Sequence, residues 1–135
     1  MIVVDTIVIA YLFMPGDHTE AARLTLAADA AWAAPLLWRS EFRNVLALYL
    51  RQHHLPLGAA LQLQAAAEEL LAGREYGVES EAVLTLAATS GRSAYDCEFV
   101  VLARALAVPF VTSDRQLLAS FPETAVALSS FATDA

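Results

Sequence analysis

Short apolar runs alternate with longer amphipathic stretches along this chain of 135 residues. The first run, residues 2–4 (Ile-Val-Val), favours a buried extended strand and stops at a carboxylate, Asp5. The apolar stretch that follows, 6–14, is too long for a loop and predicts a helix that ends before Pro15-Gly16. Four further strands are expected, at 32–34, 75–78, 108–112 and 125–128.

Six more helices are expected between these strands. They span 18–31 with Asp17 as N-cap, 36–53, 56–71, 80–88 with Ser80 as N-cap, 93 or 94 to 106, and 115–120. Short strands that alternate with helices predict a parallel sheet with right-handed crossovers. The expected fold class is therefore α/β, a three-layer α/β/α sandwich around a central parallel sheet of four or five short strands. No linker, repeat or low-complexity tail divides residues 1–135, so we expect a single domain.

Composition adds a prediction about subunits. Hydrophobic residues make up 58% of the chain, with many alanines, which favours closely packed helices and some apolar surface for a second subunit. The aromatics Trp32, Trp38, Phe42 and Tyr49 fall near one region and are compatible with a homodimer and a groove for a partner peptide. Filling of the core is the alternative, and we expect it for at least half of them.

Targeting signals and disulfides are not expected. No basic segment follows Met1, and no uncharged apolar run reaches the roughly 18 residues that span a bilayer. The only cysteine, Cys97, cannot form an internal disulfide and fits a reducing compartment. We therefore expect a cytoplasmic protein without a membrane segment.

The net charge of −7 argues against broad electrostatic attraction to nucleic acid or anionic lipid. It does not exclude a nucleic-acid substrate, because acids that hold divalent cations invert the local sign of the charge. All eight basic residues are Arg, and the chain contains no Lys.

Two carboxylates are expected at the same edge of the sheet. Asp5 and Asp114 each follow a predicted strand, and the carboxyl ends of parallel strands meet on one side, where ligands bind. Converging carboxylates repel each other and need a cation or a shared proton. Asp and Glu oxygens with bound waters suit Mg²⁺ or Mn²⁺. The three His residues and Cys97 have no ligand spacing for a softer metal.

Each acid also has a simpler explanation when taken alone. Asp5 is as well suited to cap the following helix as to bind a ligand. Asp96 falls in the first turn of its helix, where Asp commonly offsets the helix dipole. Glu41 lies inside a predicted helix, where Glu is usually a solvated surface residue, and its spacing from Arg39 does not favour a salt bridge.

Four motifs in order resemble those of the PIN-domain family, and within it the VapC-type toxin ribonucleases of bacterial toxin–antitoxin pairs. The resemblance covers essentially the whole chain, and four motifs at suitable spacing are far more specific than any one of them. The motifs are Val3-Val4-Asp5-Thr6, Pro35-Leu36-Leu37-Trp38-Arg39-Ser40-Glu41-Phe42-Arg43-Asn44-Val45-Leu46, Ala94-Tyr95-Asp96 and Val111-Thr112-Ser113-Asp114-Arg115-Gln116-Leu117-Leu118.

The resemblance implies a PIN-like fold and a metal-dependent endoribonuclease that uses Mg²⁺ or Mn²⁺. It implies Asp5 and Asp96 as the main metal-holding pair, and departs from the family pattern mildly at Cys97 and Ser113. The residues at the family's site positions are the acids Asp5, Glu41, Asp96 and Asp114, the hydroxyl residues Thr6 and Thr112, and Asn44.

The expected reaction is in-line attack of a metal-activated water on an RNA phosphodiester, leaving a 5′-phosphate and a 3′-hydroxyl. Glu41 and Asp114 are expected to ligate through water, position the nucleophile or hold a second ion. Arg43 and Arg115 are candidates to touch RNA, with a solvated surface position as the alternative. The resemblance further implies a cognate VapB-type antitoxin whose C-terminal segment wraps the toxin, and no direct DNA binding by this chain.

Two other function classes are considered. An aspartyl-phosphate receiver or phosphatase also places an Asp at a strand end, but such families resemble each other in needing a Lys near the phosphoryl group, and this chain has none. A catalytically silent PIN-like interaction module would keep the scaffold without the reaction. Retention of all four acids argues against it, and metal-dependent cleavage separates the two.

Overall fold

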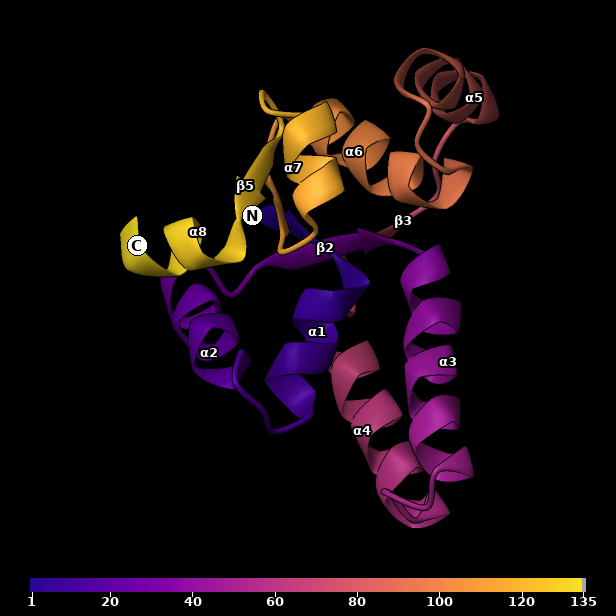
Figure 1. The fold of residues 1–135 in the computed structure, drawn as a ribbon, viewed down its shortest axis with the longest axis vertical. Helices are drawn as coiled ribbons and strands as arrows, with labels where there is room; N and C mark the ends of the chain where they lie inside the picture. Colours follow the sequence, from indigo (N-terminus) through magenta and orange to yellow (C-terminus); the bar gives the residue numbers. More distant parts are fainter. Residues whose placement is uncertain (135) are drawn as a thin grey trace.

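Five parallel strands form one sheet through the middle of the molecule (Figure 1). The computed structural model describes residues 1–134. The strands are β1 (Ile2–Val4), β2 (Trp32–Pro35), β3 (Glu75–Tyr76), β4 (Phe110–Thr112) and β5 (Ala125–Ala127), in the order β3-β2-β1-β4-β5. Every neighbouring pair is parallel. The predicted central sheet is confirmed, with five strands.

Helices cover both faces of the sheet and complete the predicted α/β/α sandwich (Figure 1). One face carries α1 (Thr6–Phe13), α2 (Thr19–Ala28), α3 (Leu37–Arg51) and α4 (Leu57–Leu70); the other carries α5 (Ser80–Ser90), α6 (Ala94–Leu106) and α7 (Arg115–Ser120). The last helix, α8 (Leu128–Asp134), follows β5 and packs against α2. Among residues 1–134, no helix combines the length and apolar character needed to cross a membrane.

The sheet lies in the core because helices cover it on both sides. All three residues of β1 are buried, as expected for a central strand without a solvent face. Trp32, Trp38 and Phe42 are each 0% exposed, whereas Tyr49 is 37% exposed. Three of the four aromatics considered as partner contacts therefore fill the core.

Several element boundaries differ from the sequence prediction; for example, α2 ends at Ala28 rather than at 31, and β4 begins at Phe110 rather than at 108. Helix α2 is preceded by His18 rather than capped by Asp17, and Ser80 is the first residue of α5 rather than its cap. The final strand ends at Ala127, because Leu128 begins α8, a helix that the sequence pattern did not predict. Only Leu128 and Phe131 in that segment pack into the core, too few to reveal a helical period.

The direction in which the chain adds strands reverses between β1 and β4. From β1 the chain builds outward to β2 and β3 on one side, and β4 and β5 are added on the other side. Open α/β sheets bind ligands where the strand order reverses in this way, beyond the carboxyl ends of the strands. In this protein that point lies beyond β1 and β4, where the chain continues with Asp5 and with Ser113-Asp114.

Candidate functional site

Asp5 lies directly beyond β1 and is mostly buried. It occupies the N-cap position of α1, yet its side chain makes no capping hydrogen bond, although the backbone N–H of Ile7 is near enough to favour the charged form. Its Oδ2 instead accepts a hydrogen bond of 2.7 Å from the Thr112 hydroxyl at the end of β4. This contact joins the residue after β1 to the last residue of β4, at the carboxyl ends of the two strands.

Glu41 reaches the same edge from α3. Its Oε1 accepts a hydrogen bond of 2.7 Å from the Thr6 hydroxyl in the first turn of α1. Thr6 is buried and Glu41 is only partly exposed, so Glu41 is not a freely solvated surface side chain. The expectation that Glu41 is an ordinary solvated residue on the helix surface is therefore wrong.

Asp96 lies in the first turn of α6 and contributes to capping there. Gly91, in the left-handed conformation at φ 72°, ends α5 and lets the chain turn toward α6. The Ser93 hydroxyl then accepts a hydrogen bond of 3.1 Å from the Asp96 backbone N–H. The positive end of the α6 dipole favours a carboxylate at this place.

Asp114 caps α7. Its Oδ1 accepts hydrogen bonds from the backbone N–H groups of Gln116 at 2.8 Å and Leu117 at 3.2 Å. Its own backbone N–H donates to the Thr112 hydroxyl at 3.0 Å, the same hydroxyl that donates to Asp5. Thr112 therefore fixes Asp5 and the start of the Asp114 turn together.

The four carboxylates act on one another. Burial raises the pKa of Asp5, Glu41 and Asp96 above their ordinary values, because a buried carboxylate loses hydration. Hydrogen bonds oppose this rise: Thr112 lowers the pKa of Asp5, Thr6 lowers that of Glu41, and Ser93 lowers that of Asp96. Negative neighbours add to it: Asp96 and Asp114 raise the pKa of Asp5, Asp5 and Asp96 raise that of Glu41, and Asp114 raises that of Asp96. Each of the four predicted acids thus lies within electrostatic reach of at least two of the others.

The other residues predicted for the site are distributed differently. Thr6 and Thr112 each bind one of the acids. Asn44 and Arg43 are exposed on α3, and Arg43 lines a hollow between α3 and α4 together with Leu57 and Leu61. Arg115 is exposed at the start of α7, next to Asp114. In the described part of the chain, no hydrogen bond or ion pair joins Asn44, Arg43 or Arg115 to the acids.

A comparison with protein-family models matches residues 2–123 to the family described as PIN domain. The chain belongs to the PIN domain family. PIN domains are typically nucleases, and the family generally uses divalent metal ions. No curated protein sequence matches the chain.

Three solved structures share this PIN fold. PAE2754 from Pyrobaculum aerophilum is 19% identical with a TM-score of 0.79, and the match covers 98% of this chain and 94% of that one. FitAcB from Neisseria gonorrhoeae is 19% identical with a TM-score of 0.72, covering 96% and 99%. FitAB bound to the IR36 DNA fragment is 20% identical with a TM-score of 0.69, covering 95% of each chain. At these identities the likeness establishes the fold alone.

The carboxylate cluster of this PIN domain fits an open site for a hard cation. Within residues 1–134, no group of three or more His, Cys, Asp or Glu side chains is drawn together closely enough to enclose a metal ion. Mg²⁺ does not require such a cage, because one or two carboxylates and several waters commonly hold it. Across the same residues, no Arg or His forms an ion pair with Asp5, Glu41, Asp96 or Asp114. No ion pair among the described residues therefore offsets their repulsion.

Sequence reasoning missed two charged residues of this PIN domain site. The charge of Arg92 lowers the pKa of Asp96, and its guanidinium donates a hydrogen bond of 2.9 Å to Gln116 on α7. Glu98, one turn into α6, adds to the rise in the Glu41 pKa. Neither lies in a motif: Arg92 belongs to the loop before α6, and Glu98 lies two residues from Asp96, a spacing that does not place side chains together on a helix.

Proposed function

We propose that this PIN domain is a metal-dependent endoribonuclease that hydrolyses RNA phosphodiester bonds and serves as the toxin of a VapBC-type toxin–antitoxin pair. The observation that carries the proposal is the gathering of Asp5 after β1, Glu41 on α3, Asp96 on α6 and Asp114 before α7. Burial and the neighbouring negative charges raise the pKa values of Asp5 and Glu41, and burial and the charge of Asp114 raise that of Asp96. Repulsion within such a cluster destabilises the folded protein, and a bound divalent cation offsets that repulsion. The cation also reduces the negative charge that would otherwise repel an anionic substrate.

In this proposal Asp5 and Asp96 hold the cation, which is Mg²⁺ or Mn²⁺. When bound, such an ion lowers the pKa of a coordinated water and neutralises charge on the phosphodiester. The Thr112 hydroxyl keeps Oδ2 of Asp5 in one orientation, and the Thr6 hydroxyl does the same for Oε1 of Glu41. Glu41 and Asp114 ligate through water or orient the attacking water.

Arg92 is the basic residue best placed to meet the substrate. Its charge already acts on Asp96, and its hydrogen bond to Gln116 holds the guanidinium between α6 and α7. A guanidinium in that position suits a phosphate oxygen next to the scissile bond. Arg92 thus takes the RNA-contacting role for which Arg43 and Arg115 were candidates in the sequence analysis.

The test is cleavage of an RNA pool by the purified protein with Mg²⁺, with Mn²⁺ and with EDTA. Cleavage is expected only with a metal, and Asp5→Asn and Asp96→Asn are each expected to slow it by about 100-fold or more. Asp17→Asn is the matched control, because Asp17 is exposed in the loop between α1 and α2. Wild-type rates in Asp5→Asn or Asp96→Asn would refute the ligand assignment. A folded wild type that binds RNA and cleaves none of it would favour the silent interaction module.

The proposed partners are a second copy of the chain and a VapB-type antitoxin, in the cytoplasm. Apolar side chains at the surface support a protein partner: Leu57 and Leu61 are each 62% exposed beside the hollow between α3 and α4, whose volume is about 220 Å³. Light scattering on the purified chain tests the homodimer, for which a mass of about twice 14.5 kDa is expected.

A further inference from the structure

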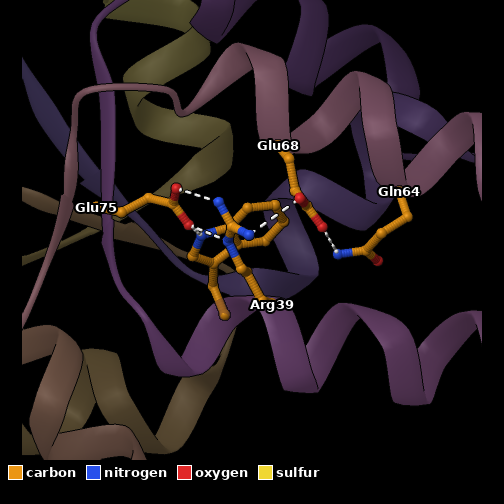
Figure 2. Close-up of polar contacts among 5 residues, drawn as sticks. Arg39, Gln64, Glu68 and Glu75 are labelled. Atoms are coloured by element: carbon orange, nitrogen blue, oxygen red, sulfur yellow. Dashed lines mark hydrogen bonds and ion pairs between the residues drawn. The ribbon is translucent and has the colours of Figure 1, made fainter.

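The start of α3 is tied to β3 by one carboxylate that accepts three hydrogen bonds (Figure 2). Arg39 donates to Glu75 twice, from Nε to Oε2 at 2.6 Å and from Nη2 to Oε1 at 2.7 Å. The indole Nε1 of Trp38 donates to the same Oε2 at 2.8 Å. We refer to Trp38, Arg39 and Glu75 as the α3 clamp.

Two members of the α3 clamp, Glu75 and Trp38, are shielded from water, whereas the Arg39 side chain is 35% exposed. The side chain of Glu75 is 11% exposed, and Trp38 is fully buried. The hydrogen bonds from Arg39 hold the pKa of Glu75 below its usual value, with a smaller contribution from Trp38. A second carboxylate, Glu68 on α4, meets Nη1 of Arg39 at 3.0 Å, so the same guanidinium also joins α3 to α4. A bidentate Arg–carboxylate pair fixes orientation as well as distance.

Helix α3 lacks the usual devices that fix a helix start. Leu36 occupies its N-cap position and provides no side-chain cap, and no acidic residue lies in the first turn. The backbone adds one tie to β3 here, from the Leu36 N–H to the Tyr76 carbonyl at 3.1 Å. The α3 clamp therefore adds directional polar contacts to the first turns of α3, beside the core packing of Trp38 and Phe42.

Glu41 depends on the rotation of α3. It lies three residues after Trp38 and two after Arg39, and its carboxylate meets α1 through the Thr6 hydroxyl at 2.7 Å. A small rotation of α3 would carry the carboxylate away from Thr6 and from Asp5. We infer that the α3 clamp is a positioning device that holds Glu41 in the carboxylate cluster and thereby sets its affinity for a divalent cation. This inference rests on the proposed metal site.

The experiment measures Mn²⁺ binding by calorimetry, without RNA, so that it does not depend on cleavage. Arg39→Met keeps the apolar stem of the side chain and removes the guanidinium. We expect its dissociation constant for Mn²⁺ to rise about 10-fold, the lower end of what loss of an outer-shell partner costs. Arg51→Met is the matched control, because Arg51 is exposed in the last turn of the same helix, and its affinity should equal that of the wild type.

A double-mutant cycle with Glu41→Gln separates positioning from a general loss of structure. If the clamp acts through Glu41, Arg39→Met causes no further loss of Mn²⁺ affinity in the Glu41→Gln background. Arg39→Lys keeps the positive charge but cannot form the bidentate pair, so its dissociation constant for Mn²⁺ should lie between those of the wild type and Arg39→Met. It also provides a folded variant if Arg39→Met does not fold.

Two results would overturn the inference. Equal Mn²⁺ affinity in wild type and in the folded Arg39 variants, even with a lower melting temperature, would limit the clamp to general stability. If the losses of Mn²⁺ affinity in Arg39→Met and Glu41→Gln were fully additive, the clamp would not act through Glu41. A wild type that binds no Mn²⁺ would instead refute the proposed metal site itself, so the two failures are distinguishable.

Discussion

Replacing Thr112 with Val tests how firmly the two central strands hold Asp5. Thr112 is 0% exposed, and its hydroxyl donates to Asp5 at 2.7 Å while accepting from the Asp114 N–H at 3.0 Å. Valine has nearly the same shape, so both hydrogen bonds are lost without a cavity. A hydrogen bond to a charged group is worth about 1.5–3 kcal/mol, and the stranded backbone N–H adds about 1 kcal/mol. The free energy of unfolding should therefore fall by about 2.5–4 kcal/mol at neutral pH.

For a chain of this length, each kcal/mol lowers the melting temperature by about 4 °C, so we expect a drop of roughly 10–16 °C for Thr112→Val. Thr112→Ser is the control: it keeps the hydroxyl, loses one methyl group and should cost only about 1 kcal/mol. Thermal melts followed by circular dichroism in EDTA measure both. A Thr112→Val melting temperature within about 2 °C of wild type, or an equal loss in Thr112→Ser, would refute this reasoning.

Three further predictions concern the carboxylates. The pKa values of Asp5, Glu41 and Asp96 are raised by folding, so their contribution to stability is fully present below the unfolded values of about 4 and is lost as pH rises through the folded values. Melts in EDTA should therefore show stability falling from about pH 4 toward neutrality, and less steeply in Asp5→Asn; a flat wild-type profile would contradict this. When the Mn²⁺ concentration is 100 times the dissociation constant, the metal should raise the free energy of unfolding of the wild type by about 2.7 kcal/mol at pH 7. It should raise that of Asp96→Asn by almost nothing, and melts with and without the metal measure both. Glu75→Ala should cost about 1–3 kcal/mol in denaturant unfolding, because it leaves the buried Trp38 indole N–H without an acceptor, whereas Arg39 is 35% exposed and can be solvated. Glu68→Ala, at a side chain that is 29% exposed, should cost less than about 1 kcal/mol, and equal costs would argue against the shielding of Glu75.

The fold was largely predictable because the local preference of most segments for helix or strand agrees with their place in the sandwich. The run Ile2–Val4 reads as a buried strand from side-chain shape alone, and the segment Arg115–Ser120 has the predicted bounds. Helix α8 was missed because, of its seven residues, only Leu128 and Phe131 are known to pack into the core, too few to show a helical period. The start of α2 was misjudged because Asp17 is a favourable cap by residue type, yet the Thr19 hydroxyl accepts the Gly16 N–H at this turn instead.

The residue types of the candidate site and the convergence of two of its acids were predictable, but the contacts that orient the acids were not. Asp5 and Asp114 follow strands that any parallel sheet would align, so their convergence follows from topology. The side-chain pairs that orient the acids join residues far apart in the chain, such as Thr112 with Asp5, 107 positions away. Arg39 and Glu75 are 36 positions apart, and no spacing rule for helices or strands connects them. Such contacts depend on how the layers pack, which a single sequence does not state.

The central claim is that the carboxylates at the ends of β1 and β4 and the start of α6 share one divalent cation. Anomalous diffraction from crystals soaked in Mn²⁺ tests it directly, with Asp5→Asn crystals treated in the same way. We predict a single strong anomalous peak bonded to carboxylate oxygens of Asp5 and Asp96 in the wild type, and its loss in Asp5→Asn. No peak beside these carboxylates, or a peak that persists unchanged in Asp5→Asn, would contradict the claim.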